Sequence, residues 1–317
     1  MTVKPTNKPI EKQFFFWAAV LILVWAGVPV LAKQGAEQLN GFEMTFWINL
    51  FAMPLVTLWV FSKEHRESLI RYSVPTILRL ASIGFLGNLL YQILYFGSYK
   101  TITAIAGSIL GRFGGVLFVV ASIVFLKERH SKSYIVALIL AIVGSIFSAV
   151  KPGASLEFSI TGGFWLMVVA TMLNTGYMFA NNGIKARFPD TRANLFIFKA
   201  STLIVIATWS ILTYSGLITT EPAFDINLSP HLADLRVPFL LGVFADGIGF
   251  LAFLKVLELS DSVKTTIVNA TVAVTQVFLA VLIFRESASF INAILAPSLV
   301  IIPTTIAGIM DTRTKVE

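Results

Sequence analysis

The chain has 317 residues, of which 56% are hydrophobic and 13% are charged, and its mean hydropathy is +0.81. Soluble domains carry roughly 25% charged residues, so this composition excludes an ordinary soluble fold and indicates a protein of the lipid bilayer. The absence of cysteine excludes disulfides and thiolate metal sites, and the net charge of +7 is better explained by membrane topology than by nucleic acid.

An apolar run of about 20 residues can cross a bilayer as a helix. The sequence contains ten such runs, and the first is too long in its apolar part to be a signal peptide. In chain order the predicted spans are 14–32, 42–61, 77–97, 102–126, 133–150, 162–182, 194–215, 237–257, 261–284 and 290–309. The expected fold class is therefore an all-α membrane protein with ten transmembrane helices.

The basic residues orient these spans. With the N-terminus in the cytoplasm, 18 of the 24 Lys and Arg residues fall on the inner side, Lys199 among them, while five fall outside and Arg112 lies within a span. Such an excess of bases marks the cytoplasmic side of a membrane protein. We expect a multi-pass integral protein with both termini in the cytoplasm and the loop 216–236 outside. In a bacterium it would lie in the inner cell membrane.

The chain repeats one pattern. SIVFLKERHS (122–131) and AVLIFRESAS (280–289) lie 158 positions apart. Two copies of five spans follow, in residues 1–150 and 151–317, and an odd number of spans per copy makes the repeat inverted. Inverted repeats are typical of transporters, whose substrate sites lie at the interface of the copies. The same offset pairs Gly84 with Gly242 and Asn88 with Asp246.

Ten spans, a five-plus-five repeat and the motif FLKER at the end of the fourth span resemble the drug/metabolite transporter superfamily, in particular its EamA-like members. WAG (25–27) in the first span and LYFGSY (94–99) in the third fit the same pattern. The chain departs from it at Asn49, where members often carry Arg. The resemblance covers about 14–309 and implies a substrate cavity lined mainly by spans 1, 3, 4, 6, 8 and 9 that opens to one side at a time.

Two charged residues lie deep in predicted spans. An ionised side chain at the bilayer centre costs at least ~2.5–3.5 kcal/mol and usually faces a partner or a wet cavity. Arg112 and Asp246 enter from the same side to similar depth, so we predict that they pair when the cavity is empty. A pair that fixes helix packing is the alternative to a substrate site. Asp246 is also the candidate residue for proton coupling.

Stripes that include polar residues recur on one face of the third, sixth, eighth and ninth spans. Helix packing is the alternative interpretation, because one interhelical hydrogen bond contributes only ~0.6 kcal/mol on average. The predicted substrate-binding residues are Arg112, Asp246, Asn88, Gln92, Tyr95, Asn174, Tyr177, Asn269, Gln276 and Trp25.

The sequence lacks HExxH, GxSxG, paired-histidine and Walker motifs. We therefore expect no catalytic residues, no metal ligands, no cofactor and no enzyme activity. The predicted function is a secondary transporter that moves a small metabolite, such as an amino acid or an organic anion, by alternating access. A non-transporting sensor or scaffold and an intramembrane enzyme are the alternatives. The expected partners are the substrate and the lipid bilayer, without nucleic acid, and proton coupling and a homodimer are left open.

Overall fold

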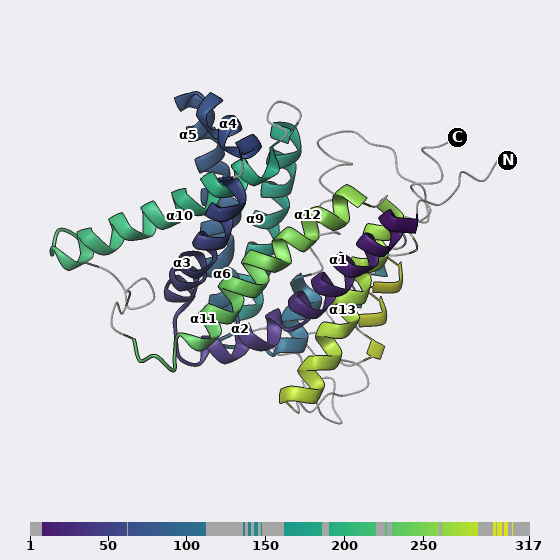
Figure 1. Cartoon of the computed structure of the whole chain (residues 1–317). Coiled ribbons are helices and arrows are strands. Elements are labelled where there is room, and N and C mark those ends of the chain that lie inside the picture. The colour runs from purple at the N-terminus through teal and green to yellow at the C-terminus, as the bar shows by residue number, and fades with distance from the viewer. Residues whose placement is uncertain are drawn as a thin grey trace.

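The computed structural model (Figure 1) describes residues 8–61, 63–111, 162–185, 190–219, 230–259 and 262–284. It also describes residue 226 and scattered residues within 136–147 and 294–306. Every element in this part of the chain is a helix, as predicted. In order these are α1 (Lys8–Ala26), α2 (Val28–Ala36), α3 (Gly41–Val60), α4 (Lys63–Arg71), α5 (Val74–Gly84), η1 (Phe85–Leu90), α6 (Tyr91–Ser98), α9 (Gly162–Lys185), α10 (Thr191–Tyr214), α11 (Arg236–Leu240), η3 (Leu241–Gly249), α12 (Phe250–Leu259) and α13 (Ser262–Phe284).

Five segments of the described chain are long and apolar enough to cross a membrane, and each contains or nearly matches a predicted span. The sixth predicted span is α9, and the ninth is α13. Most of the fourth, fifth and tenth predicted spans falls outside the described residues, so the count of ten and the five-plus-five division stay predictions. The five segments are Lys12–Ala36, Gly41–Val60, Val74–Ser98, Thr191–Tyr214 and Arg236–Val256.

The first span is interrupted between α1 and α2. Pro29 is the second residue of α2, and proline has no N–H to donate to the carbonyl four residues earlier, which belongs to Trp25. Regular helical bonding therefore stops around Gly27. Beyond the interruption, Nζ of Lys33 donates a hydrogen bond of 2.8 Å to the carbonyl oxygen of Tyr99. This bond places a cation at the C-terminal end of α6, where helix carbonyls lack intrahelical donors.

The third and eighth spans each contain a π-helix, η1 and η3. π-Helices occur frequently at functional sites, and the offset of 158 brings these two into register. A Cβ on Gly84 would lie 2.8 Å from a backbone atom of α10, and a Cβ on Gly242 would lie 2.5 Å from a backbone carbonyl of α3. At both positions glycine allows a close helix contact between the two predicted copies.

The apolar core of the described residues consists of several separate clusters. Near α2 and α11, one cluster joins residues of α2, α3, α6, α9 and η3. Near the opposite end, Leu80 and Phe198 belong to a cluster on α5 and α10, while Leu21 and Val256 belong to a cluster on α1 and α12. These two clusters share no residue, and their helices lie to the left and right in the upper half of Figure 1.

Candidate functional site

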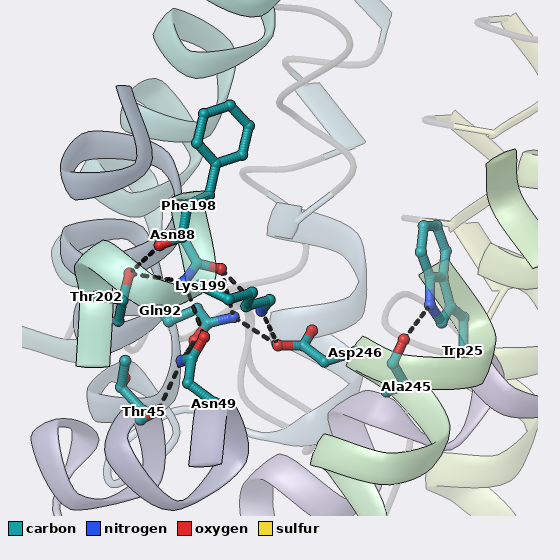
Figure 2. A network of polar contacts seen from close by, with 10 residues as sticks. All are labelled: Trp25, Thr45, Asn49, Asn88, Gln92, Phe198, Lys199, Thr202, Ala245 and Asp246. Atoms are coloured by element: carbon teal, nitrogen blue, oxygen red, sulfur yellow. Dashed lines mark hydrogen bonds and ion pairs between the residues drawn. The ribbon is translucent and has the colours of Figure 1, made fainter. Parts of the chain in front are cut away.

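A buried lysine is the centre of the polar site. Lys199 lies on α10 and is only 2% exposed, and its Nζ donates a hydrogen bond of 2.9 Å to Oδ1 of Asn88 on η1. The same ammonium forms an ion pair with Oδ2 of Asp246 on η3 (Figure 2). A buried charge is stable only when it is paired and hydrogen-bonded, and Lys199 meets both conditions.

The position of Lys199 corrects the topology assignment made from the sequence. From the sequence alone, this lysine counts among the cytoplasmic bases, because it lies only five residues inside the predicted seventh span, 194–215. In the structure α10 begins at Thr191, with Asp190 as its N-cap accepting hydrogen bonds from the backbone N–H groups of Arg192 and Ala193. Lys199 is therefore about 12 Å along the helix at 1.5 Å per residue. The excess of bases on the predicted inner side remains without it.

Three amide side chains surround the ion pair. Gln92 on α6 donates from Nε2 to Oδ2 of Asp246 at 3.0 Å and to Oδ1 of Asn88 at 3.3 Å. Asn49 on α3 donates from Nδ2 to Oε1 of Gln92 at 2.7 Å and accepts from Nδ2 of Asn88 at 2.8 Å. Five elements thus meet in one network, because these four residues and Lys199 come from α3, η1, α6, α10 and η3.

The outer members of the network orient its amides. Nδ2 of Asn88 also donates to Oγ1 of Thr202 at 2.8 Å, and Nδ2 of Asn49 donates to the carbonyl oxygen of Thr45 at 2.7 Å. Asn88 is left with Oδ1 facing Lys199, so the network presents an acceptor to the ammonium. Satisfied buried networks of this kind are rigid and specify one arrangement of the helices around them.

A cavity of about 300 Å³ lies beside the network. Its size is at the lower end of the range for small-molecule sites. Asn88, Gln92, Lys199 and Asp246 form a polar side of its lining, and Ser108 and Asn174 add further polar groups. The aromatic residues that line it are Trp25, Tyr91, Tyr95, Phe96, Tyr177, Phe198 and Phe250.

Trp25 connects the first span to the site. Its indole Nε1 donates to the carbonyl oxygen of Ala245 at 3.1 Å, next to Asp246 in the chain, and its ring stacks on Phe253 with centroids 5.2 Å apart. Its own carbonyl oxygen accepts a 2.9 Å hydrogen bond from Nε2 of Gln276 on α13. Trp25 is therefore held through its indole by η3 and α12 and through its backbone carbonyl by α13.

The structure brings most of the predicted site residues to one place, while their role in binding stays a prediction. Arg112 and the side chain of Asn269 lie outside what the structure describes, and so does the predicted pairing of Arg112 with Asp246. Lys199 was missed, although a lysine inside an apolar segment is a signal for function. The residues that line the cavity as predicted are Trp25, Asn88, Gln92, Tyr95, Asn174, Tyr177, Asp246 and Gln276.

Residues 13–150 match the family model described as the EamA-like transporter family. The first part of the chain is thus similar to this family. An archaeal protein from Archaeoglobus fulgidus, named an uncharacterized transporter, is 25% identical over 279 residues, which cover 87% of this chain and 91% of that protein. A solved structure described as that of a protein resembles the fold with a TM-score of 0.65 and 17% identity, covering 96% of this chain and 99% of the other.

The match to this family model and the apolar helices together support a multi-pass integral membrane protein. The family and the archaeal relative's name point to a transporter rather than an enzyme. At 17% identity the solved structure supports the fold alone.

Proposed function

We propose that this protein is a secondary transporter that carries one small amphipathic metabolite at a time through the cavity by alternating access. The observation that supports it most is the Lys199–Asp246 pair beside a cavity of about 300 Å³ among membrane-spanning helices. Ionisable groups at this depth mark substrate or ion pathways in membrane proteins. The polar side would hold the charged part of the substrate and the aromatic side its apolar body.

The positions of the apolar clusters are consistent with a cavity that opens toward one side. The cluster that joins α2, α3, α6, α9 and η3, and includes Tyr99 and Met44, would close the end near α2, which is the predicted outer end. At the other end the separate clusters around Phe198 and Val256 would leave access between them from the predicted cytoplasm. A transport cycle would then open the first contact and bring the two separate clusters together.

Gly111 offers a direct test, because it lines the cavity and, among the described residues, the nearest atom to a Cβ there belongs to Tyr95, at 4.0 Å. Gly111→Leu should fill part of the cavity without a backbone clash and should lower flux in proteoliposomes by at least tenfold. Gly176→Leu is the matched control, because Gly176 lies outside the cavity lining and no atom of the described residues lies within 4 Å of a Cβ there.

The assay is exchange of labelled metabolites across proteoliposomes, with a panel of amines, amino acids and organic anions as candidate substrates. Flux in the wild type and in Gly176→Leu, together with loss in Gly111→Leu, would support transport through this cavity. Folded protein that moves no compound of the panel would favour the sensor or scaffold alternative. Equal flux in both variants would place the pathway elsewhere.

A further inference from the structure

We propose that Asp246 receives the ammonium group of an amine-bearing substrate, which rests on the proposed function and specifies the substrate class of the same cavity. The two charges of the site are not equally accessible. The side chain of Asp246 is 25% exposed, whereas that of Lys199 is 3% exposed. The charge that the described residues present to a ligand is therefore mainly a carboxylate.

The hydrogen bonds that the described residues make to Asp246 reach only one of its two oxygens. Both described donors, Nζ of Lys199 and Nε2 of Gln92, reach Oδ2. A carboxylate can accept about four hydrogen bonds over its two oxygens. Figure 2 shows Oδ1 directed away from the lysine, and none of the described residues donates a hydrogen bond to it. A substrate N–H could bind Oδ1 while the pair with Lys199 remains intact.

Lys199 is poorly placed to receive an anion. Its ammonium already contacts Oδ1 of Asn88 and Oδ2 of Asp246, and these two residues come from different helices. These bonds use two of the three N–H donors of the ammonium, and the side chain is only 3% exposed. A substrate carboxylate would therefore have little access to the third donor.

The residues beside Asp246 suit a cation with an apolar body. Phe250 follows Asp246 by four residues, which places the two on one helical face, and both line the cavity. The indole of Trp25 donates a hydrogen bond to the carbonyl oxygen of Ala245, the residue before Asp246. Aromatic faces attract ammonium groups through their quadrupole, so these rings would favour an amine over a carboxylate.

Three probes that share a phenyl ring separate the charge classes: 2-phenylethylammonium, phenylalanine and 3-phenylpropanoate. Binding to purified protein in detergent is measured by calorimetry. We expect the amine to bind at least tenfold more tightly than the anion, and phenylalanine to bind more tightly than the anion as well. Tighter binding of 3-phenylpropanoate by the wild type would overturn the proposal without any variant.

Two variants locate the binding group. Asp246→Asn should weaken 2-phenylethylammonium by at least tenfold, because a charged hydrogen bond is lost. Lys199→Met should keep or improve binding of the amine, because a nearby positive charge is removed. Loss of amine binding in folded Lys199→Met with retention in folded Asp246→Asn would contradict the assignment. If a variant does not fold, the ranking of probes on wild-type protein still decides.

The two proposals fail separately. Amine binding that requires Asp246, without flux in proteoliposomes, would leave the binding site standing and refute transport. Flux of an organic anion that Gly111→Leu blocks, without amine binding, would support transport and refute the amine site.

A second inference concerns Gln276, which was predicted to bind substrate. We infer that Gln276 is a positioning residue that replaces the N–H group missing at Pro29. The carbonyl of Trp25 would normally accept from residue 29, and proline cannot donate. Nε2 of Gln276 donates to this carbonyl at 2.9 Å instead. Gln276 thereby stabilises the break between α1 and α2. It also fixes the position of Trp25, whose indole donates a hydrogen bond to Ala245.

Restoring the missing donor tests this role. Gln276→Leu should lower flux several-fold, and Pro29→Ala in the same chain should recover it, because the backbone N–H gained by this substitution can then bond the carbonyl of Trp25. Pro54 lies inside α3, so Pro54→Ala is the matched control and should not rescue Gln276→Leu. A double variant with Pro29→Ala that regains stability without regaining flux would show that Gln276 binds the substrate directly.

Discussion

Removing the partners of the Lys199–Asp246 pair one at a time should destabilise the protein unequally. In Asp246→Asn the ammonium of Lys199 stays in a site that is 3% exposed and loses its counter-charge. Breaking a buried pair in this way costs about 3–5 kcal/mol. In Lys199→Met, Asp246 remains 25% exposed and retains the hydrogen bond from Gln92. We expect this variant to lose about 1.5–3 kcal/mol, the range for a hydrogen bond to a charged group.

The double variant Lys199→Met/Asp246→Asn should be more stable than Asp246→Asn alone. It removes both charges, so no ammonium remains buried without a carboxylate, and replacement of a whole buried pair is often neutral. The two single effects should therefore be non-additive, as is usual for residues in direct contact.

Unfolding of purified protein in detergent can be followed by intrinsic fluorescence, because the chain contains six tryptophans. The expected order of stability is wild type, Lys199→Met, then Asp246→Asn. Lys100→Met is the control, because Lys100 is exposed and surface substitutions usually change stability by less than about 0.5 kcal/mol. The reasoning fails if Asp246→Asn is as stable as Lys199→Met, or if the double variant shows the sum of the two losses.

Three further predictions use other parts of the structure. Gly87→Ala should reduce the folded yield, because its Cβ would lie 2.0 Å from a tyrosine ring. Gly97→Ala should be tolerated, because no atom of the described residues lies within 4 Å of its Cβ, and size-exclusion profiles compare the two variants. In the cysteine-free chain, a cysteine replacing Leu232 should be labelled in intact cells, and one replacing Glu67 only after permeabilisation; the opposite pattern would reverse the predicted orientation. Burial, with a smaller contribution from Asp190, raises the pKa of Tyr72 to about 12. The neutral phenol therefore contributes stability that is fully present below about pH 10 and is lost as the pH rises toward 12. Tyr72→Phe should flatten that part of the curve of stability against pH, measured by fluorescence.

The sequence by itself determined the class of protein and most helix positions. In a bilayer each helix must satisfy its own backbone hydrogen bonds, so a span is a local property that hydropathy reveals. The predicted third span, 77–97, lies within the observed Val74–Ser98, and the second, 42–61, differs from Gly41–Val60 by one residue at each end. The offset of 158 also paired Asn88 with Asp246 before their shared contact with Lys199 was known.

The tertiary structure decided which polar residues meet. Depth and charge favoured Arg112 as the partner of Asp246, yet the partner that the described residues provide is Lys199, which the sequence had placed at the cytoplasmic edge. The periodicity of one helix shows which face is polar but not which neighbour that face contacts. Here the contact between Lys199 and Asp246 depends on close helix packing at Gly84 and Gly242. The role of Gln276 depends on the carbonyl of Trp25 in the distant first span, to which Pro29 cannot donate.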